Sequence, residues 1–464
     1  MKLSQKEARH IYQRAGFGVS YSALQSKIGL TAAEVFQEIK HNSSAVQETN
    51  AIGLSDRVSG PYPKGLSTAE QNDYRVARAN SFVKVNLTWL RSMFNSKSDL
   101  REKMTVFWHD HFAFIAKNPY LCQDLLNTIR KYALGDFRSL LTNVSKHPAM
   151  LEFLDNQRNN RDAPNENFAR EFLELFTLGI GNYSEADIKE AARAFTGWKY
   201  KFDGSWQYYF DHKSHDDEPK TFLGETGQFT GDDIINITLN HRATAKHLAT
   251  KIYLFLVSDE PDEDRIDELA DTFYQRGYNI ESLLDEIFMS EWFYSDEIIG
   301  SKIKSQMEYL VGLGRFLRIE CPQDYPLVVM QQYVGQHLLN PPNVGGWPSG
   351  RELINSSSLF FRMKLPQVIL DEGVEDERFD FLGSSDSDDF YHKIRGSADI
   401  SKFYSEFSDL PLERALMELR FYVLGQEVES VDPRRLESGW FKSEGDIFVD
   451  YLKELLQLPE YQLC

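Results

Sequence analysis

The sequence predicts a mainly α-helical protein, a large multi-helix globular array with one small β-hairpin insertion. Helix-start signals recur, because a hydroxyl residue stands three positions before an acid at the head of several periodic apolar runs. These capping boxes are Ser4–Glu7, Thr31–Glu34, Ser67–Glu70 and Ser184–Asp187. Strand-like patterning falls within residues 199–211, where two short aromatic runs flank the turn dipeptide Asp203-Gly204. Helix should therefore outweigh strand several-fold.

Helical periodicity places the other elements in chain order. The N-terminal segment is an amphipathic helix, and a loop at residues 340–350 interrupts the later helices. Its glycines permit positive φ and close backbone approach, and its prolines stiffen the path. The remaining expected helices cover residues 67–94, 98–116, 119–132, 136–147, 165–178, 231–239, 241–257, 262–276, 280–290 and 298–318.

Composition divides the chain into three parts. Residues 1–370 form the main helical domain, which contains the hairpin. From residue 371 the sequence turns acidic and Ser-rich, so we predict an acidic linker at 371–399. Residues 400–464 then form a small C-terminal helical region.

Charge and hydropathy exclude several partner classes. A formal net charge of −19 argues against general nucleic-acid binding, since a phosphate backbone needs a positive surface. No stretch approaches the ~20 apolar residues of a membrane span. The N-terminus lacks the apolar centre of a signal peptide, which predicts a cytoplasmic protein, or an exported one if a leader was removed. Cys122, Cys321 and Cys464 lie far apart, which fits reduced core thiols better than a disulfide framework.

Residues 165–178 predict a helix with two contrasting faces. A rotation of about 100° per residue separates its apolar side chains from its polar ones. The first group is Phe168, Phe172, Leu175 and Phe176, and the second is Asn167, Arg170, Glu171 and Glu174. The polar face is either a wet surface or the wall of a polar cavity in which these groups work.

Two neighbouring histidines have separate roles if residues 98–116 are helical. His111 falls in the apolar stripe with Phe107, whereas His109 lies nearly opposite, beside Glu102. Residues at i and i+2 cannot ligate one metal from a regular helix. We therefore expect His111 to pack inward and His109 to lie on the less apolar side, available to a pocket.

Standard catalytic motifs are absent from the sequence. It contains no Walker A motif, no GxGxxG after a strand, no HExxH, no CxxC pair and no GxSxG elbow. Imidazoles and carboxylates remain, and they suit either a metal centre or metal-free acid–base catalysis. The candidates are His109, Asp110, His111, Glu166, Arg170, Glu171, Glu174, His215 and Asp216. Trp198 and Trp347 either stack a flat ligand or pack in the core.

Several longer motifs, in a fixed order, point to one family. The first are Ala8-Arg9-His10 and Arg14-Ala15-Gly16-Phe17-Gly18, and the last is Pro342-Asn343-Val344-Gly345-Gly346-Trp347. The most specific between them are Phe107-Trp108-His109, His111-Phe112, Asn165-Glu166-Asn167, Ala169-Arg170-Glu171, Leu178-Gly179, Thr196-Gly197-Trp198, His215-Asp216, Lys220 and Leu223-Gly224. In these motifs the chain resembles the large bacterial family named domain of unknown function 1800. The resemblance weakens in the C-terminal region.

The resemblance implies site residues rather than a reaction, because the family's activity is not established. Its pattern fixes polar residues of the 165–174 helix, which favours the cavity interpretation. The chain departs from the pattern at Phe176, where the family often has His, and at Asp217-Glu218-Pro219, where it usually has a Gly. A metal model that needs a ligand at position 176 therefore fails. Members often occur beside sulfatase-like proteins and in exported settings, which implies a sulfatase-like protein as a partner.

Two functional hypotheses stay open for the pocket on which these motifs should converge. In the first, the protein is a hydrolase or transferase acting on a sugar or peptide-like substrate. Its catalytic residues would be His109, Glu171, Glu174, His215 and Asp216, and its ligand-binding residues Asn165, Asn167, Arg170, Lys220, Trp198 and Trp347. In the second, it is a non-catalytic binding or assembly protein whose polar motifs form a structural network. An open cavity would favour the first hypothesis, and mutually satisfied side chains the second.

A transition metal is a further expectation that depends on whether these elements meet. His215, Asp216, Glu171, Glu174 and His109 would then supply the ligands of a zinc- or iron-type centre. A centrally placed Arg170 weighs against it, because a guanidinium repels a cation and neutralises the same carboxylates.

Overall fold

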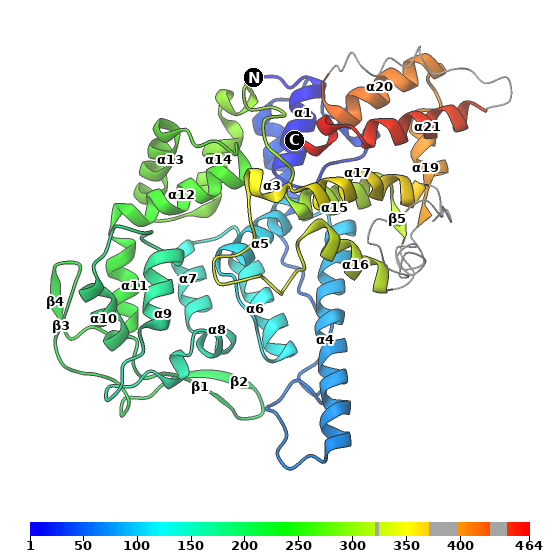
Figure 1. The fold of residues 1–464 in the computed structure, drawn as a ribbon. Helices are drawn as coiled ribbons and strands as arrows, with labels where there is room; N and C mark the ends of the chain where they lie inside the picture. The colour runs from blue at the N-terminus through cyan, green and yellow to red at the C-terminus, as the bar shows by residue number, and fades with distance from the viewer. Residues whose placement is uncertain (321–323, 371–396, 427–442) are drawn as a thin grey trace.

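The computed structural model describes residues 1–320, 324–370, 397–426 and 443–464. Helices dominate these residues, and the strands among them pair into three small two-stranded antiparallel sheets. The prediction of a mainly α-helical protein is confirmed (Figure 1). Most of the predicted acidic linker, residues 371–396, lies outside the described residues.

The first third of the chain is entirely helical in its regular structure. It contains α1 (Gln5–Arg14), α2 (Tyr21–Gln25), α3 (Ala32–Asn42), α4 (Thr68–Asn95), α5 (Asp99–His111), α6 (Pro119–Tyr132), α7 (Phe137–Ser145) and α8 (Pro148–Phe153). The predicted capping boxes begin α1, α3 and α4, and a fourth begins α10 (Glu185–Ala194). In each, the hydroxyl accepts the N3 backbone N–H while the N3 acid accepts the N-cap N–H, so two otherwise unpaired donors are satisfied.

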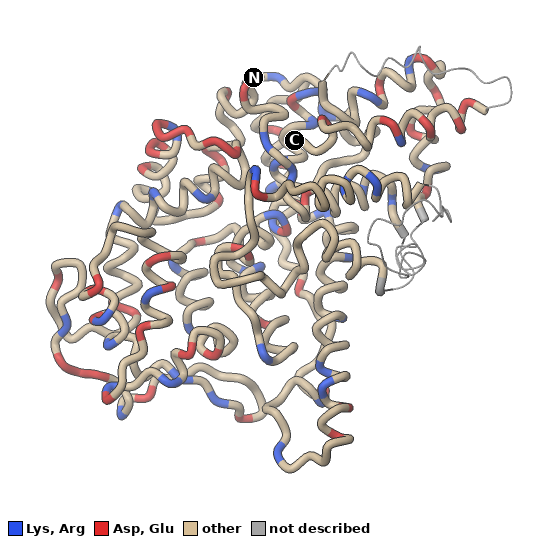
Figure 2. Tube along the Cα trace, viewed as in Figure 1, with Lys and Arg blue, Asp and Glu red and all other residues tan. Residues whose placement is uncertain are grey.

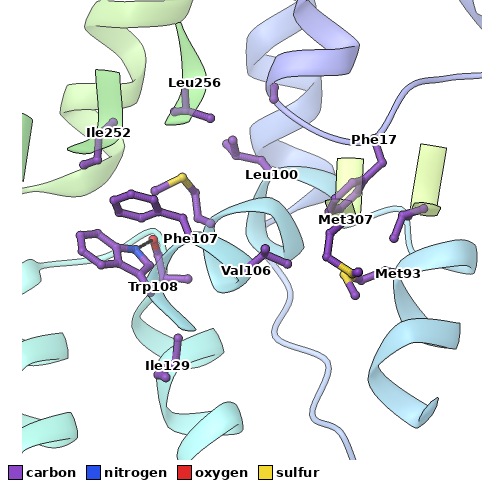
Figure 3. Close-up of a cluster of buried hydrophobic side chains, with 14 of the residues drawn as sticks. Phe17, Met93, Leu100, Val106, Phe107, Trp108, Ile129, Ile252, Leu256 and Met307 are labelled. Carbon is purple, nitrogen blue, oxygen red and sulfur yellow. Dashed lines mark hydrogen bonds between the residues drawn. The ribbon is translucent and has the colours of Figure 1, made fainter. Parts of the chain in front are cut away.

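Helix α5 forms the centre of the core. Residues 100–109 are all buried, and so is His111. Figure 3 shows Leu100, Val106, Phe107 and Trp108 among side chains from other helices, including Met93 of α4 and Ile129 of α6. A helix enclosed on every side has no wet face, so its amphipathic pattern is weak and cannot orient its polar residues.

The middle of the chain holds the predicted hairpin and a second, unpredicted one. Strands β1 (Trp198–Phe202) and β2 (Trp206–Phe210) pair antiparallel, with Trp198 opposite Phe210, which confirms the hairpin near 199–211. A further hairpin joins β3 (Lys220–Phe222) to β4 (Glu225–Gly227). Its turn uses Leu223 and Gly224, both at positive φ, as a tight hairpin of two central residues requires. The described residues therefore contain two hairpins, one more than the sequence predicts.

The 165–178 segment is not one regular helix. It consists of α9 (Glu166–Glu171) followed by a π-helical turn, η2 (Phe172–Phe176). Thr177 Oγ donates to the Phe172 carbonyl oxygen at 2.6 Å, and the Gly179 N–H donates to that of Leu173 at 3.1 Å. The Leu175 and Phe176 carbonyl oxygens bond side chains from other helices, so tertiary contacts override the regular helical pattern here.

A second helical series follows the hairpins. It contains α11 (Gly231–Leu239), α12 (Arg242–Leu256), α13 (Glu263–Gln275), α14 (Ile280–Met289), η3 (Glu291–Tyr294) and α15 (Gln306–Phe316). The first four match the predicted bounds closely. The helix expected at 298–318 starts only at Gln306, because Ile303 and Lys304 pair in extended form with Leu463 and Gln462.

The C-terminal third returns to the N-terminal helices, so both ends of the chain lie near each other (Figure 1). It contains β5 (Ile319–Glu320), α16 (Asp324–Val334), η4 (Gly350–Leu353), α17 (Ser356–Leu370), β6 (Ser397–Ala398), α19 (Ile400–Ser405), α20 (Leu412–Leu424), α21 (Glu444–Leu456) and η6 (Pro459–Gln462). Helix α21 packs on α17, and β6 pairs with β5. The domain boundaries near residues 370 and 400 stay a prediction.

Candidate functional site

His109 lies inside the core rather than on a less apolar side of α5. It is 1% exposed, and its ring lies near those of Trp89, Phe114 and Trp347, with centroids 5.2–5.4 Å away. Its Nε2 accepts the Leu339 N–H at 3.0 Å. Burial lowers the pKa of the His109 imidazole to about 3, so this side chain is neutral at physiological pH. The prediction that His109 lies on a less apolar side of the helix is wrong, because α5 is buried on all sides.

Asp110, the next residue, is half-buried and meets the 340–350 loop. The Trp347 N–H donates to Asp110 Oδ1 at 2.8 Å. Gly346 makes this approach feasible, since its φ is +89° and a Cβ added there would lie 2.3 Å from the same oxygen. The predicted close backbone approach of this loop is confirmed at Gly346.

His111 and Lys251 connect α5 to α12. The Lys251 ammonium donates to His111 Nδ1 at 3.2 Å, and His111 Nε2 lies 3.3 Å from the Phe176 carbonyl oxygen. An ammonium has only donors and a carbonyl only acceptors, so the imidazole is neutral with its proton on Nε2. His111 is buried, as predicted, but it contacts a charged group rather than only apolar ones.

The π-helical turn supplies the other acceptors of this cluster. The Leu175 carbonyl oxygen accepts from His247 Nε2 at 3.1 Å and from Lys251 Nζ at 3.4 Å. Widened turns of this kind free backbone carbonyls from the helical ladder and often occur at functional sites. We name the cluster of Asp110, His111, His247 and Lys251 the Asp110–Lys251 site.

Burial favours the uncharged forms of both the acid and the base of this site. It raises the pKa of the Asp110 carboxyl to about 6, against the opposing effects of the Trp347 N–H and the Lys251 charge. Burial also lowers the pKa of the Lys251 ammonium, which the Asp110 charge opposes. Burial lowers the pKa of His247 to about 4. Among the described residues, Asp110 and Lys251 have no ion pair within 4.0 Å of each other or of any other charged group.

His215, Asp216 and Lys220 form a second cluster, the Asp216 network, with Arg193 and Thr196. Arg193 binds the Asp216 carboxylate through two bonds of 2.7 and 3.1 Å. Lys220, fully buried, donates to the carbonyl oxygens of Asp216 and Glu218 at 2.5 and 3.0 Å. Although burial acts to raise it, bonding by Arg193 lowers the pKa of the Asp216 carboxyl.

His215 and Thr196 complete the Asp216 network. His215 Nδ1 lies 2.9 Å from the Thr196 carbonyl oxygen, to which it donates. The Thr196 hydroxyl donates to the Arg193 carbonyl oxygen at 2.6 Å and accepts the Asp216 N–H at 2.8 Å. The charged groups of the network are thus bonded to one another or to backbone.

The polar residues of α9 are bonded within their own region. Asn165 is the N-cap and accepts the Asn167 N–H at 3.0 Å, while the Asn167 side chain donates to the Leu154 carbonyl oxygen at 3.1 Å. Arg170 binds Glu185 through two bonds of 2.9 Å at the surface. The predicted ligand-binding groups of this helix therefore have protein partners.

Glu171 and Glu174 lie half-buried beside the π-helical turn. Tyr183 donates its hydroxyl to Glu174 at 3.1 Å. Burial, followed by the charge of Glu174, raises the pKa of the Glu171 carboxyl. These are the predicted catalytic residues nearest in sequence to the Leu175 carbonyl.

Both candidate tryptophans have enclosed rings. Trp198 is 1% exposed, with Phe195 and Phe168 at centroid distances of 5.0 and 6.2 Å and the Lys146 ammonium 5.2 Å from its ring. Trp347 is 9% exposed and packs edge-on against His109. Core packing, the second interpretation of these residues, describes their surroundings.

The predicted ligands of a metal are not gathered in one place. No three His, Cys, Asp or Glu side chains in the described parts of the chain lie close enough to hold an ion. His109 is in the α5 core, Glu171 and Glu174 flank the π-helical turn, and the other two predicted ligands belong to the Asp216 network. Within the described residues, the predicted site residues therefore do not converge on one pocket. Helical periodicity predicts the direction in which a side chain points, but it does not determine which helices meet.

Sequence reasoning missed two members of the Asp110–Lys251 site and underrated a third. His247 and Lys251 belong to none of the motifs, although their i, i+4 spacing places them on one helix face. Asp110 is among the ionisable candidates of the sequence, but only its neighbour His109 is among the predicted catalytic residues. The available signal was an acid in the last turn of the helix, shortly after the apolar residues 106–108.

Together, the fold and this site define a mainly helical protein with a half-buried acid–base cluster where its N-terminal and central helices meet the 340–350 loop. A family model described as a protein of unknown function (DUF1800) matches residues 10–463, so the chain belongs to this family. No match was found among curated proteins or among solved structures. None of the helices in the described ranges is both long and apolar enough to cross a membrane.

Proposed function

We propose that the chain is an enzyme that performs acid–base chemistry at the Asp110–Lys251 site, as a hydrolase or transferase acting on a sugar or peptide-like substrate. One observation supports this most directly. A half-buried carboxyl with a pKa near 6 lies close to a half-buried ammonium with which it forms no ion pair. Ionisable groups whose pKa values are shifted toward neutral pH are typical of acid–base catalytic sites.

The carboxyl is held in position with one oxygen unused. Trp347 fixes Oδ1, and Oδ2 forms no hydrogen bond within the described residues. A carboxyl with a pKa near 6 exists in both protonation states around neutral pH. Asp110 Oδ2 can therefore take a proton from a substrate hydroxyl or an attacking water, or return one to a leaving group.

Lys251 provides the complementary charge. Two of its three N–H donors are bonded, to His111 and to the Leu175 carbonyl oxygen, so one remains for a ligand. These two bonds orient the ammonium before a ligand arrives. An oriented ammonium in a partly desolvated site stabilises negative charge on a substrate oxygen better than water does.

A non-catalytic binding or assembly role is the second candidate, and the Asp216 network favours it. There, motif residues expected to be catalytic bond one another instead of a ligand. If the Asp110–Lys251 site were also structural, replacing its acid would change stability without removing any activity.

The test is turnover of a panel of nitrophenyl glycosides, nitrophenyl esters and peptide nitroanilides by the full chain. We expect hydrolysis in at least one class, with a kcat/KM that changes around pH 6, the pKa of Asp110. Asp110→Asn should reduce that kcat/KM by about 100-fold or more, and Lys251→Met should reduce it as well.

Asp217→Asn is the matched control, because it removes the same charge from an exposed residue. It should leave turnover unchanged. Absence of turnover across the panel, or equal rates for the wild type and Asp110→Asn, would reject the catalytic proposal in favour of the binding role.

A further inference from the structure

A separate cavity lies between the N-terminal and the C-terminal helices, and none of the residues that line it belongs to the Asp110–Lys251 site. It has a volume of about 360 Å³, and residues of α1, α15 and the C-terminal helices line it. Figure 2 shows several Lys and Arg positions on the segments around α1 and the end of the chain. None of the residues predicted as catalytic or ligand-binding lines this cavity.

Most of the charged groups that line the cavity are paired. Lys27 binds Glu38 at 2.7 Å, and Arg315 binds Asp99 at the same distance. Further ion pairs join Arg318 to Glu406 and Glu308 to Lys103. Such pairing is the usual state of charged groups that lose contact with water.

Arg9 and Lys304 are the exceptions among the buried cavity residues. They are 7% and 6% exposed, yet neither forms an ion pair within 4.0 Å in the described ranges. Arg9 donates to the carbonyl oxygens of Tyr422 and Val423 at 2.8 and 2.7 Å, and Lys304 donates to that of Tyr461 at 2.5 Å. The Arg9 Nη1 donates no hydrogen bond within these ranges. Neutral carbonyls orient these two basic side chains but do not supply an ion-pair partner.

The surrounding core increases the positive charge. Arg14, Lys103 and Arg362 are fully buried nearby, and Arg362 donates to the Lys304 carbonyl oxygen. Glu308 supplies a buried negative charge, but it already forms an ion pair with Lys103. Burial and the charge of Arg9 lower the pKa of the Lys304 ammonium to about 7. Buried basic side chains thus outnumber the one buried acid, Glu308, among the residues named here, which are Arg9, Arg14, Lys103, Lys304 and Arg362.

We propose that this cavity binds a small organic anion, a molecule with a carboxylate or phosphate group that contacts Arg9 and Lys304. An anion there would satisfy the free Arg9 nitrogen and compensate two buried charges at once. The apolar walls define the rest of the ligand, because Tyr12, Phe17 and Tyr422 also line the cavity. Its body should be apolar or aromatic and small enough for the cavity.

The test is isothermal titration of the full chain with phenyl phosphate, benzoate and neutral benzamide. We expect saturable one-site binding of at least one of the two anions, which also tells a phosphate from a carboxylate ligand. Lys304→Gln should weaken that binding by about tenfold or more, the effect of losing one charge-assisted hydrogen bond. Lys97→Gln, which removes an exposed lysine from the rim, should change it less than about twofold.

Lys304→Gln should fold, because it removes an unpaired buried charge. A second variant keeps both cations: Ala23→Phe should narrow the cavity and weaken binding of the same anion. The proposal is wrong if neither anion binds, if benzamide binds as tightly as the anions, or if these two variants bind as the wild type does. This outcome is independent of turnover at Asp110, since the two sites share no residue.

Discussion

The Asp216 network and the Asp110–Lys251 site contain the same residue types, yet they differ in how their charges are satisfied. Each has an aspartate, a lysine and a histidine partly or wholly removed from water. In the network, Arg193 binds the aspartate through two bonds, whereas in the site the aspartate accepts only a backbone N–H. The pKa of Asp216 is lowered and that of Asp110 is raised to about 6.

This difference shows why residue type alone does not identify a functional site. A carboxylate that loses water but gains a guanidinium keeps its charge and contributes to folding. One that loses water without such a partner costs stability, and it becomes an acid that can exchange protons near neutral pH. Changes at the two aspartates should therefore have opposite effects on stability.

The largest expected effect is the loss of stability in Asp216→Asn. This change removes the carboxylate that binds Arg193 beside the buried Lys220 and leaves Arg193 with Glu190 alone, which should lower the free energy of unfolding by about 2–3 kcal/mol. Urea unfolding of the full chain at pH 7 measures it. Asp110→Asn, in the same assay, should be at least as stable as the wild type. If both variants lost the same stability, the two aspartates would have equivalent structural roles.

The second effect is the pH dependence of stability that Asp110 causes. Asp110 has a pKa near 3.8 when unfolded and about 6 when folded. Between these values the folded chain holds a proton that the unfolded chain has lost, so the stability contributed by this group falls as pH rises toward 6. Asparagine cannot ionise. Relative to the wild type, Asp110→Asn should therefore gain stability with rising pH, by no more than about 3 kcal/mol at pH 7.

Thermal unfolding of both proteins at pH 4, 5, 6 and 7 tests this dependence. Burial lowers the pKa of His10, His109, His111 and His247, so the unfolded chain binds protons below pH 6.5 that the folded chain does not. These histidines make both proteins less stable as pH falls, and their effect cancels in the difference between them. A difference that stays constant over this range would mean that Asp110 titrates normally.

The features that could be predicted from the sequence depend on residues that lie close together in the chain. Capping boxes such as Ser67–Glu70 depend on residues three apart, and the 198–210 hairpin depends on one turn dipeptide and its flanking aromatics. Such features form wherever the local sequence allows, so their positions were predicted to within a few residues. The family followed from motif order in the same way, and its match to residues 10–463 confirms it.

Contacts between distant segments account for what it could not predict. The π-helical turn exists where Lys251 and His247 bond the Leu175 carbonyl, and these partners lie more than seventy positions away in sequence. Arg193 lies 23 positions from Asp216, and no pattern links the two. Whether a polar residue is free or paired depends on which helices meet. A single sequence does not contain that information, because it does not show which positions change together.

The smallest expected effect concerns Arg170, which the sequence placed at the centre of a polar face. Its side chain is 38% exposed, and its main partner Glu185 is 71% exposed, so water and salt screen their attraction. Arg170→Met should lower the melting temperature of the full chain by no more than about 2 °C. Arg193→Met, which removes the same kind of side chain from the half-buried Asp216 network, should lower it distinctly more. An Arg170 effect as large as that of Arg193 would show that the α9 surface is covered in solution, because only desolvation makes such a pair strong.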